Sequence, residues 1–296
     1  MSSGFQYFIT QLLNGLSVGS MYALVAVGYS MVYSILYLIN FAHGDLFIFG
    51  TFLAFAFFNM GMPLAGAMII GAILCGIIAM GIERVVYRPV RNASRIVPMV
   101  GALGAALILR TVAQVCWGAS QIVFPSLIPS KQISLGGGFQ INVQNLVVLG
   151  IGVACVLLLT IVIQGTKIGK ATQCVMQDIT TSSLRGIPIN VIIPLVYALG
   201  GFLGTIGGVL MCSYYTVINI EMGLWGTCKA WAASQLGGVG SFYGAFAGGI
   251  ILGVAESLAA AYISSAYKDA IGYIIIVVVL LFMPEGLFGK KKAVKV

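Results

Sequence analysis

The 296-residue chain is 60% hydrophobic and only 7% charged, with a formal net charge of +8. Soluble globular chains are about one-quarter charged, so this composition excludes a water-soluble domain and requires lipid to cover much of the surface. The positive charge does not indicate nucleic-acid binding, because the basic residues cluster in a few segments between apolar runs.

Long charge-free runs predict membrane helices. They lie between Asp45 and Glu83, between Lys131 and Lys167, and between Arg185 and Glu221. Each exceeds the roughly 20 residues that a helix needs to cross a hydrocarbon core of about 30 Å. Solid apolar runs favour helices over a membrane barrel, whose strands would alternate apolar and polar residues. We therefore predict an all-α polytopic membrane protein with about eight transmembrane helices plus short or re-entrant helices.

In chain order, the spans are predicted at 9–33, 46–60, 63–83, 96–117, 144–165, 190–212, 241–262 and 269–286. A short apolar piece at 226–239 precedes the seventh span. The N-terminus carries no Lys or Arg before its apolar run, which indicates an uncleaved first span rather than a signal peptide.

Basic residues concentrate in three segments, which the positive-inside rule places in the cytoplasm. The segments contain Arg84, Arg88, Arg91 and Arg95; then Lys167, Lys170 and Arg185; then Lys290, Lys291, Lys292 and Lys295. This arrangement requires the 226–239 piece to cross the membrane or to dip in beside a partner helix. Counting membrane crossings back from the first cytoplasmic segment places the N-terminus outside.

A short internal sequence repeat, which we call the echo, suggests two related halves. Tyr22-Ala-Leu is followed by Asn40, and Tyr197-Ala-Leu is followed by Asn219. Five predicted spans separate the two asparagines, so the copies have opposite orientation. Inverted repeats of this kind are common in transporters. We predict one transmembrane domain over 1–296, with pseudo-repeats of about 9–117 and 190–286.

Glycines at four-residue spacing predict close helix packing, because small residues four apart share one helix face. These glycines are Gly15/Gly19, Gly200/Gly204/Gly208, Gly244/Gly248 and Gly249/Gly253.

Polar residues interrupt the apolar pattern after each copy of the echo. Unpaired polar groups are expensive in lipid, so they line a cavity or are satisfied by neighbouring helices. The candidates for a substrate path are Asn40, His43, Asp45, Asn219, Glu221 and Glu256. For 40–45 the alternative is a loop at the membrane edge. For Glu256 the preferred structural explanation is pairing with Lys229. We expect Arg110 to extend toward the outer interface.

Catalytic and metal sites are not predicted. His43 is the single histidine, which excludes a serine-type triad or a histidine-ligated metal site built by this chain alone. The six cysteines are scattered singly and resemble packing residues.

The loop at about 166–188 is the most polar stretch of the second half. Gly165 and Gly169-Lys170 superficially suggest a phosphate-binding loop, but the spacing is one residue short and Ala171 replaces the required Ser or Thr. We predict instead an amphipathic helix over 171–184, closed by Gly186 and Pro188, with Val175, Ile179 and Leu184 as an apolar edge. Such a helix suits docking into a groove on a partner protein.

Several segments resemble the permease subunits of bacterial branched-chain amino-acid ABC importers, closest to the LivH type. They are Ile39-Asn-Phe-Ala-His-Gly-Asp45, Ile82-Glu-Arg-Val-Val-Tyr-Arg-Pro-Val-Arg91, Leu236-Gly-Gly-Val-Gly-Ser241, Ala266-Tyr-Lys-Asp269 and Met283-Pro-Glu-Gly-Leu287. The resemblance covers essentially the whole chain in order. The first segment also occurs in related urea and short-chain-amide permeases.

This resemblance implies a second permease of the LivM type, two cytoplasmic ATPase subunits that bind ATP and Mg, and a periplasmic binding protein. It places the chain in the inner membrane. It also makes the 166–188 loop the ATPase-coupling segment, with candidates Lys170, Ala171, Asp178, Ser183, Arg185 and Gly186. The family's usual acidic pair is Gln177-Asp178 here, and a usual alanine is Ser183.

The leading hypothesis is a permease that imports leucine, isoleucine or valine by alternating access, driven by separate ATPases. A secondary transporter or channel is the alternative, with Glu221 and Glu256 as ion or proton relays. An integral-membrane enzyme is disfavoured, because no dense cluster of catalytic side chains occurs.

Overall fold

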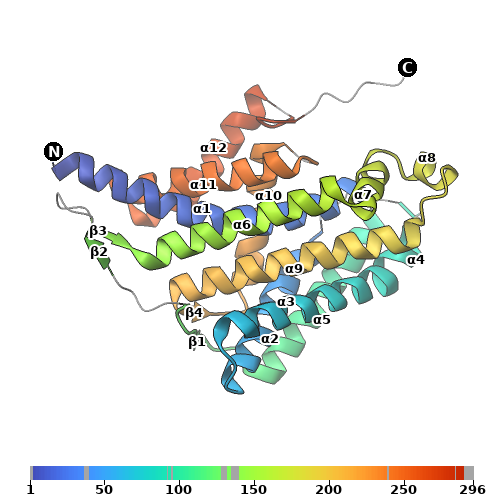
Figure 1. Ribbon diagram of the computed structural model, residues 1–296, viewed down its shortest axis with the longest axis horizontal. Coiled ribbons are helices and arrows are strands. Elements are labelled where there is room, and N and C mark those ends of the chain that lie inside the picture. Colours follow the sequence, from blue (N-terminus) through green and yellow to red (C-terminus); the bar gives the residue numbers. More distant parts are fainter. Residues whose placement is uncertain are drawn as a thin grey trace.

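The computed structural model describes residues 3–36, 40–91, 93–94, 96–127, 132–134, 140–238, 240–283 and 285–289. It is almost entirely helical, as predicted (Figure 1). Ile39, Arg95 and the lysines at 290–292 and 295, all used in the sequence argument, lie outside the described residues.

The described first half of the chain contains five longer helices, the short helix α4, a short π-helix η1 and three short strands. They are α1 (Ser3–Leu36), α2 (Ala42–Asn59), α3 (Leu64–Ile82), η1 (Glu83–Tyr87), α4 (Arg88–Val90), α5 (Ile96–Trp117), β1 (Ile122–Val123), β2 (Gln132–Ser134), β3 (Gln140–Asn142) and α6 (Val143–Gly165). The Asn142 side chain accepts a hydrogen bond from the Gln144 amide and so caps α6.

The second half begins with the polar segment and ends in a short helix. Its elements are α7 (Lys167–Gln177), α8 (Ile179–Leu184), α9 (Ile189–Tyr215), β4 (Val217–Ile218), α10 (Met222–Gly237), α11 (Phe242–Tyr262), the 3₁₀ turn η2 (Ser265–Tyr267) and α12 (Lys268–Phe282). Strand β1 pairs antiparallel with β4, and β2 with β3.

Eight helical segments of the described chain are long and apolar enough to span a membrane, which confirms the predicted fold class. The apolar piece predicted at 226–239 forms α10, whose 16 residues extend about 24 Å, short of a core of about 30 Å. The start of α1 and the four strands lie at one end of the molecule, whereas α4, α7 and α8 lie at the other (Figure 1). The basic segments 84–91 and 167–185 are therefore at the end opposite the start of α1, as the charge pattern predicts.

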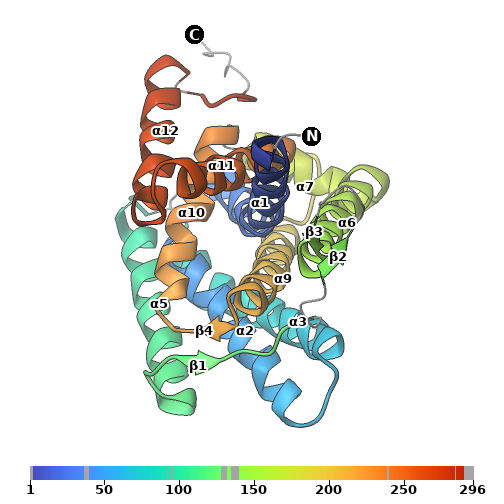
Figure 2. The same cartoon turned by 90° about the vertical axis from the view of Figure 1, so that its left-hand side faces the viewer.

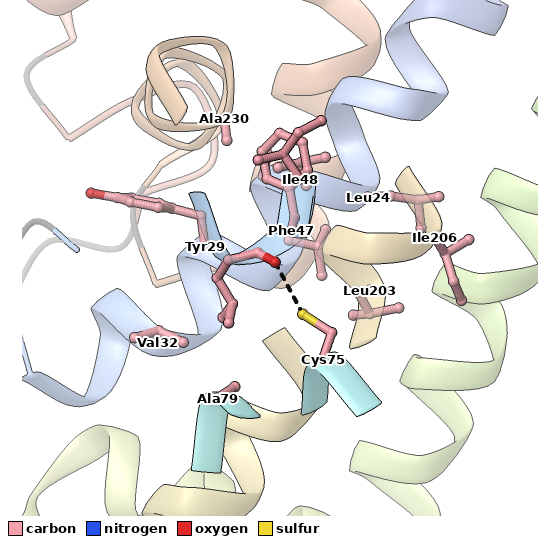
Figure 3. Close-up of a cluster of buried hydrophobic side chains, with 14 of the residues drawn as sticks. Leu24, Tyr29, Val32, Phe47, Ile48, Cys75, Ala79, Leu203, Ile206 and Ala230 are labelled. Carbon is pink, nitrogen blue, oxygen red and sulfur yellow. Dashed lines mark hydrogen bonds between the residues drawn. The ribbon is translucent and has the colours of Figure 1, made fainter. Parts of the chain in front are cut away.

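The centre of the bundle is formed by α1, α2, α9 and α10, and α5, α6 and α12 lie at its periphery (Figure 2). Leu24, Phe47 and Leu203 meet in this core, where the Cys75 thiol donates a hydrogen bond of 3.2 Å to the Leu46 carbonyl oxygen (Figure 3). The core is thus assembled from helices that are far apart in the sequence.

The glycine pattern explains how closely the helices approach. A side-chain carbon at Gly19 of α1 would lie 2.8 Å from the Cα of Ile250 in α11, and one at Gly15 would lie 2.7 Å from the Cα of Val254. Because only hydrogen fits at these positions, α1 and α11 pack backbone against backbone, where dispersion forces are strongest. This confirms the packing role predicted for Gly15 and Gly19.

The single helix predicted over 171–184 is wrong. Asp178 has extended backbone angles (φ −158°, ψ 111°) and separates α7 from α8. Its carboxylate accepts hydrogen bonds from the amides of Thr180 (2.9 Å) and Thr181 (3.2 Å). Aspartate is among the best helix N-caps and a poor interior residue, so a new helix begins here.

The predicted apolar edge of this segment is also wrong, because its members do not share a face. Val175 is 1% exposed, whereas Leu184 is 85% exposed. The break at Asp178 gives α7 an inward apolar face and leaves the tip of α8 in the open.

Candidate translocation site

The two asparagines of the internal echo begin helices in the same way. The Ala42 amide donates to the Asn40 side-chain oxygen at 3.0 Å before α2, and the Glu221 amide donates to the Asn219 side-chain oxygen at 3.0 Å before α10. Each asparagine thereby satisfies a backbone amide where the helical ladder is interrupted. Both echo positions are therefore helix breaks, not points within continuous spans.

Four residues after each asparagine, a glycine brings the two new helices into contact. A side-chain carbon at Gly223 would lie 3.0 Å from the Gly44 carbonyl oxygen, and one at Gly44 would overlap the Gly223 carbonyl and the Thr227 hydroxyl. The sequence argument did not select Gly44 and Gly223 as site residues, although each occurs at the same offset in its copy of the echo. We call this pair the glycine contact.

His43 is inside the protein rather than beside an open passage. Its side chain is 1% exposed, its Nε2 lies 3.2 Å from the Val25 carbonyl oxygen, and its ring meets Tyr29 edge-on at 5.7 Å between centroids. His43 and Asp45 both lie in the first turns of α2, so the alternative of a loop at the membrane edge is wrong. In this conformation His43 is satisfied by neighbouring helices.

Asp45 forms a bidentate ion pair with Arg110 of α5. The Arg110 Nε donates to Asp45 Oδ1 at 3.0 Å, and Nη2 donates to Oδ2 at 3.3 Å. Arg110 therefore turns inward to α2, and the expectation that it extends to the outer interface is wrong. A carboxylate in the interior draws the guanidinium inward because an unpaired buried charge is far more costly than a paired one.

Glu256 belongs to a second charged group, as predicted from Lys229. The Lys229 ammonium donates to Glu256 Oε1 and to Asp269 Oδ1 (2.9 Å), and the Tyr22 hydroxyl donates to Glu256 Oε2 at 3.0 Å. Lys229 also lies over the ring of Tyr273, 5.0 Å from its centroid. The sequence argument missed Asp269 because nothing in the local pattern distinguishes it from an ordinary span end.

The predicted path residues with described partners bind different groups. Asn40 also accepts a hydrogen bond of 2.7 Å from the Tyr87 hydroxyl, Asp45 binds Arg110, and Glu256 binds Lys229. Glu221 is exposed at the start of α10, and Asn219 is half-buried there. What unites the two halves is the glycine contact, which joins the helices after both breaks.

The predicted coupling residues occupy the end of the molecule that carries α7 and α8 (Figure 1). Ala171 is half-buried in α7, Asp178 caps α8, and Gly186 ends the segment with a positive φ of 78°. The other candidates, Lys170, Ser183 and Arg185, are exposed. Ser183, Leu184 and Arg185 form an exposed tip at the end of α8, with both apolar and basic character.

Comparison with known proteins shows the family. Residues 11–280 match the family described as branched-chain amino acid transport system / permease component. The chain is 38% identical over 308 residues to the high-affinity branched-chain amino acid transport system permease protein LivH of Salmonella typhimurium, and the match covers 100% of both chains. It is 35% identical to the corresponding protein BraD of Pseudomonas aeruginosa, over 98% of each chain.

A solved structure has the same fold. PsaBC from Streptococcus pneumoniae in complex with Fab superposes with a TM-score of 0.53 and 12% identity, covering 92% of this chain and 91% of that one. The relatives named above are transport permeases and not enzymes. The chain is therefore a multi-pass membrane protein that belongs to the family of permease components of branched-chain amino acid transport systems.

Proposed function

We propose that the chain is one of two permease subunits of an ATP-driven importer that carries leucine, isoleucine and valine across the inner membrane. The observation that carries this proposal is the full-length similarity to permeases named for high-affinity branched-chain amino acid transport. The partners are a LivM-type permease, two cytoplasmic ATPases that hold ATP and Mg, and a periplasmic binding protein.

The glycine contact is the proposed pivot for alternating access. Helices α2 and α10 start at breaks, are shorter than most spans, and touch through Gly44 and Gly223, with the Thr227 and Ile48 side chains packed against the two glycines. A contact centred on two glycines favours sliding or rocking of the packed helices, because few side-chain rotamers must change. Motion here would open the path first to one side and then to the other, beside Asn40, His43, Asn219 and Glu221.

The exposed tip of α8 is the proposed contact with an ATPase. An apolar side chain that is 85% exposed at Leu184, flanked by Ser183 and Arg185, fits a groove with an apolar floor and an acidic rim. Lys170 adds positive charge on α7 of the same segment. Movement of the ATPases would then reach the bundle through α7, which packs on α9.

The arrangement of the acidic residues supports this proposal over a proton-driven carrier. Both Glu256 oxygens are occupied, one by Lys229 and the other by Tyr22, and Glu221 is exposed at a helix end. Among the described residues, no hydrogen bond or ion pair links the two carboxylates into a relay. A relay would need a continuous chain of proton carriers across the bilayer.

Co-purification tests the assembly directly. We expect the detergent-solubilised chain to bring down one second permease and two ATPase subunits, and leucine-loaded binding protein to stimulate their ATP hydrolysis more than urea or a short-chain amide does. A chain that purifies alone and moves leucine without nucleotide would refute the proposal.

A further inference from the structure

Arg110 is an unusual residue in its position on α5. It lies seven residues before the end of the helix at Trp117, about 10 Å inside that end, and its side chain is 29% exposed. Of the basic residues in the described ion pairs, it is the most exposed, since Arg91 is 16% and Lys229 1% exposed. A partly exposed guanidinium at this depth is costly if it faces lipid, so this face of α5 requires a polar or water-filled environment in the assembled transporter.

The ion pair leaves one edge of Arg110 available. Nε and Nη2 bind the two oxygens of Asp45, and Nη1 makes no hydrogen bond to any residue that the structure describes. Asp45 itself is only 4% exposed and follows Gly44 directly, so the pair adjoins the glycine contact. On α5, the apolar side chains of Leu107 and Leu103 are exposed on the same helix face, about one and two turns from Arg110 respectively.

These features match the chemistry of one class of cargo. An aliphatic amino acid carries a carboxylate and one apolar side chain, and this site offers a free guanidinium edge beside an apolar stripe. Hydrogen bonds from arginine to a carboxylate are charge-assisted and therefore among the stronger ones. Urea and short-chain amides lack a carboxylate and would gain little from such a site.

We infer that Arg110, held in place by Asp45, binds the carboxylate of an aliphatic amino acid in transit through the free Nη1 edge of its guanidinium. This inference rests on the proposed function and adds residues that determine the class of cargo. Because Asp45 adjoins the glycine contact, motion of α2 would change the exposure of this site.

A photoreactive leucine carrying a diazirine tests the inference in the complete transporter with its binding protein. We expect wild type to be labelled on α2 and α5 under turnover. In the double variant D45N/R110Q, which keeps hydrogen-bonding groups of similar shape, labelling and leucine uptake should each fall by about tenfold or more, the equivalent of one charge-assisted hydrogen bond. R110K keeps the positive charge but loses the planar guanidinium with its several donors. Its labelling and leucine uptake should lie between those of wild type and of D45N/R110Q.

The matched control is E83Q/R91Q, which neutralises another ion pair that shares no residue with this site. It should leave labelling of α5 by the bound cargo unchanged. The inference is overturned if D45N/R110Q assembles with its partners and takes up leucine within twofold of wild type, or if wild type transports leucine without labelling α2 or α5. Failure of wild type to transport leucine at all would instead refute the proposed function.

Discussion

Lys229 shows what a single buried charge does for the fold. Its ammonium is 1% exposed and serves two carboxylates, one on α11 and one on α12, so three helices depend on one side chain. Burying these ions is costly, and their mutual attraction offsets that cost only while all partners are present.

Removal of this cation should destabilise the protein strongly. We predict that Lys229→Met lowers the free energy of unfolding by about 3–5 kcal/mol, because Glu256 is left as an unpaired buried charge. Chemical denaturation in detergent measures the change. The double variant K229M/E256Q should recover much of the loss, whereas equal stability of K229M and wild type would show that the pair contributes nothing.

The glycine contact offers a steric test. In Gly44→Ala the added methyl group would overlap the Gly223 carbonyl and the Thr227 hydroxyl, so we predict a loss of stability of about 1–3 kcal/mol and severe loss of uptake. Gly104→Ala is the control, since no atom lies within 4 Å of that position and alanine favours helix. Normal uptake by Gly44→Ala would show that the glycine contact has no part in the transport mechanism.

The two ion pairs also show which side-chain contacts a sequence reveals. Lys229 and Glu256 could be paired in advance because both are isolated charges in apolar surroundings, where few partners exist. The pairing of Asp45 with Arg110 joins residues 65 positions apart on α2 and α5, and depends on how those helices cross. The hydropathy of α5 alone predicted that the Arg110 side chain extends to the outer interface, because a hydropathy pattern describes one helix and not its neighbours.

Among the elements, the spans were the most predictable feature. Long apolar runs with few or no charges identified all eight candidate helices, because lipid permits no other use for such stretches. The division of 167–184 into α7 and α8 was not foreseen, because the decision depends on whether the Asp178 carboxylate caps a helix or faces solvent within one. The internal echo pointed to both helix breaks, but it could not show that Gly44 and Gly223 meet.

The α7–α8 segment should transmit the ATPase motion as a rigid unit. Gly186→Pro is incompatible with the φ of 78° at this position, and Asp178→Arg removes the cap of α8. We predict that either variant remains inserted and retains ATP hydrolysis by its partners, but takes up little leucine. Paired hydrolysis and uptake assays measure this coupling ratio.

Gly165→Ala is the control for these coupling variants, because nothing lies within 4 Å of that position at the start of the same segment. Its coupling ratio should equal that of wild type. Undiminished uptake by Gly186→Pro and Asp178→Arg would assign the coupling role to another surface.

At the scale of the whole molecule, the proposed function makes the bundle a passage and assigns the source of energy to separate ATPases. The central helices α1, α2, α9 and α10 pack through glycines, and the buried charges of the described chain are held in ion pairs. Such a structure can change shape only if something outside it favours one arrangement over the other, since a bistable bundle shifts by the difference in binding energy between its two states. The ATPases would favour one arrangement by binding to the exposed tip of α8.

Leucine uptake into proteoliposomes tests this account most directly. The vesicles contain both permeases and the ATPases, with binding protein outside and ATP inside. We predict uptake that requires ATP hydrolysis and survives collapse of the proton gradient. Uptake that proceeds without nucleotide and disappears with the proton gradient would contradict it.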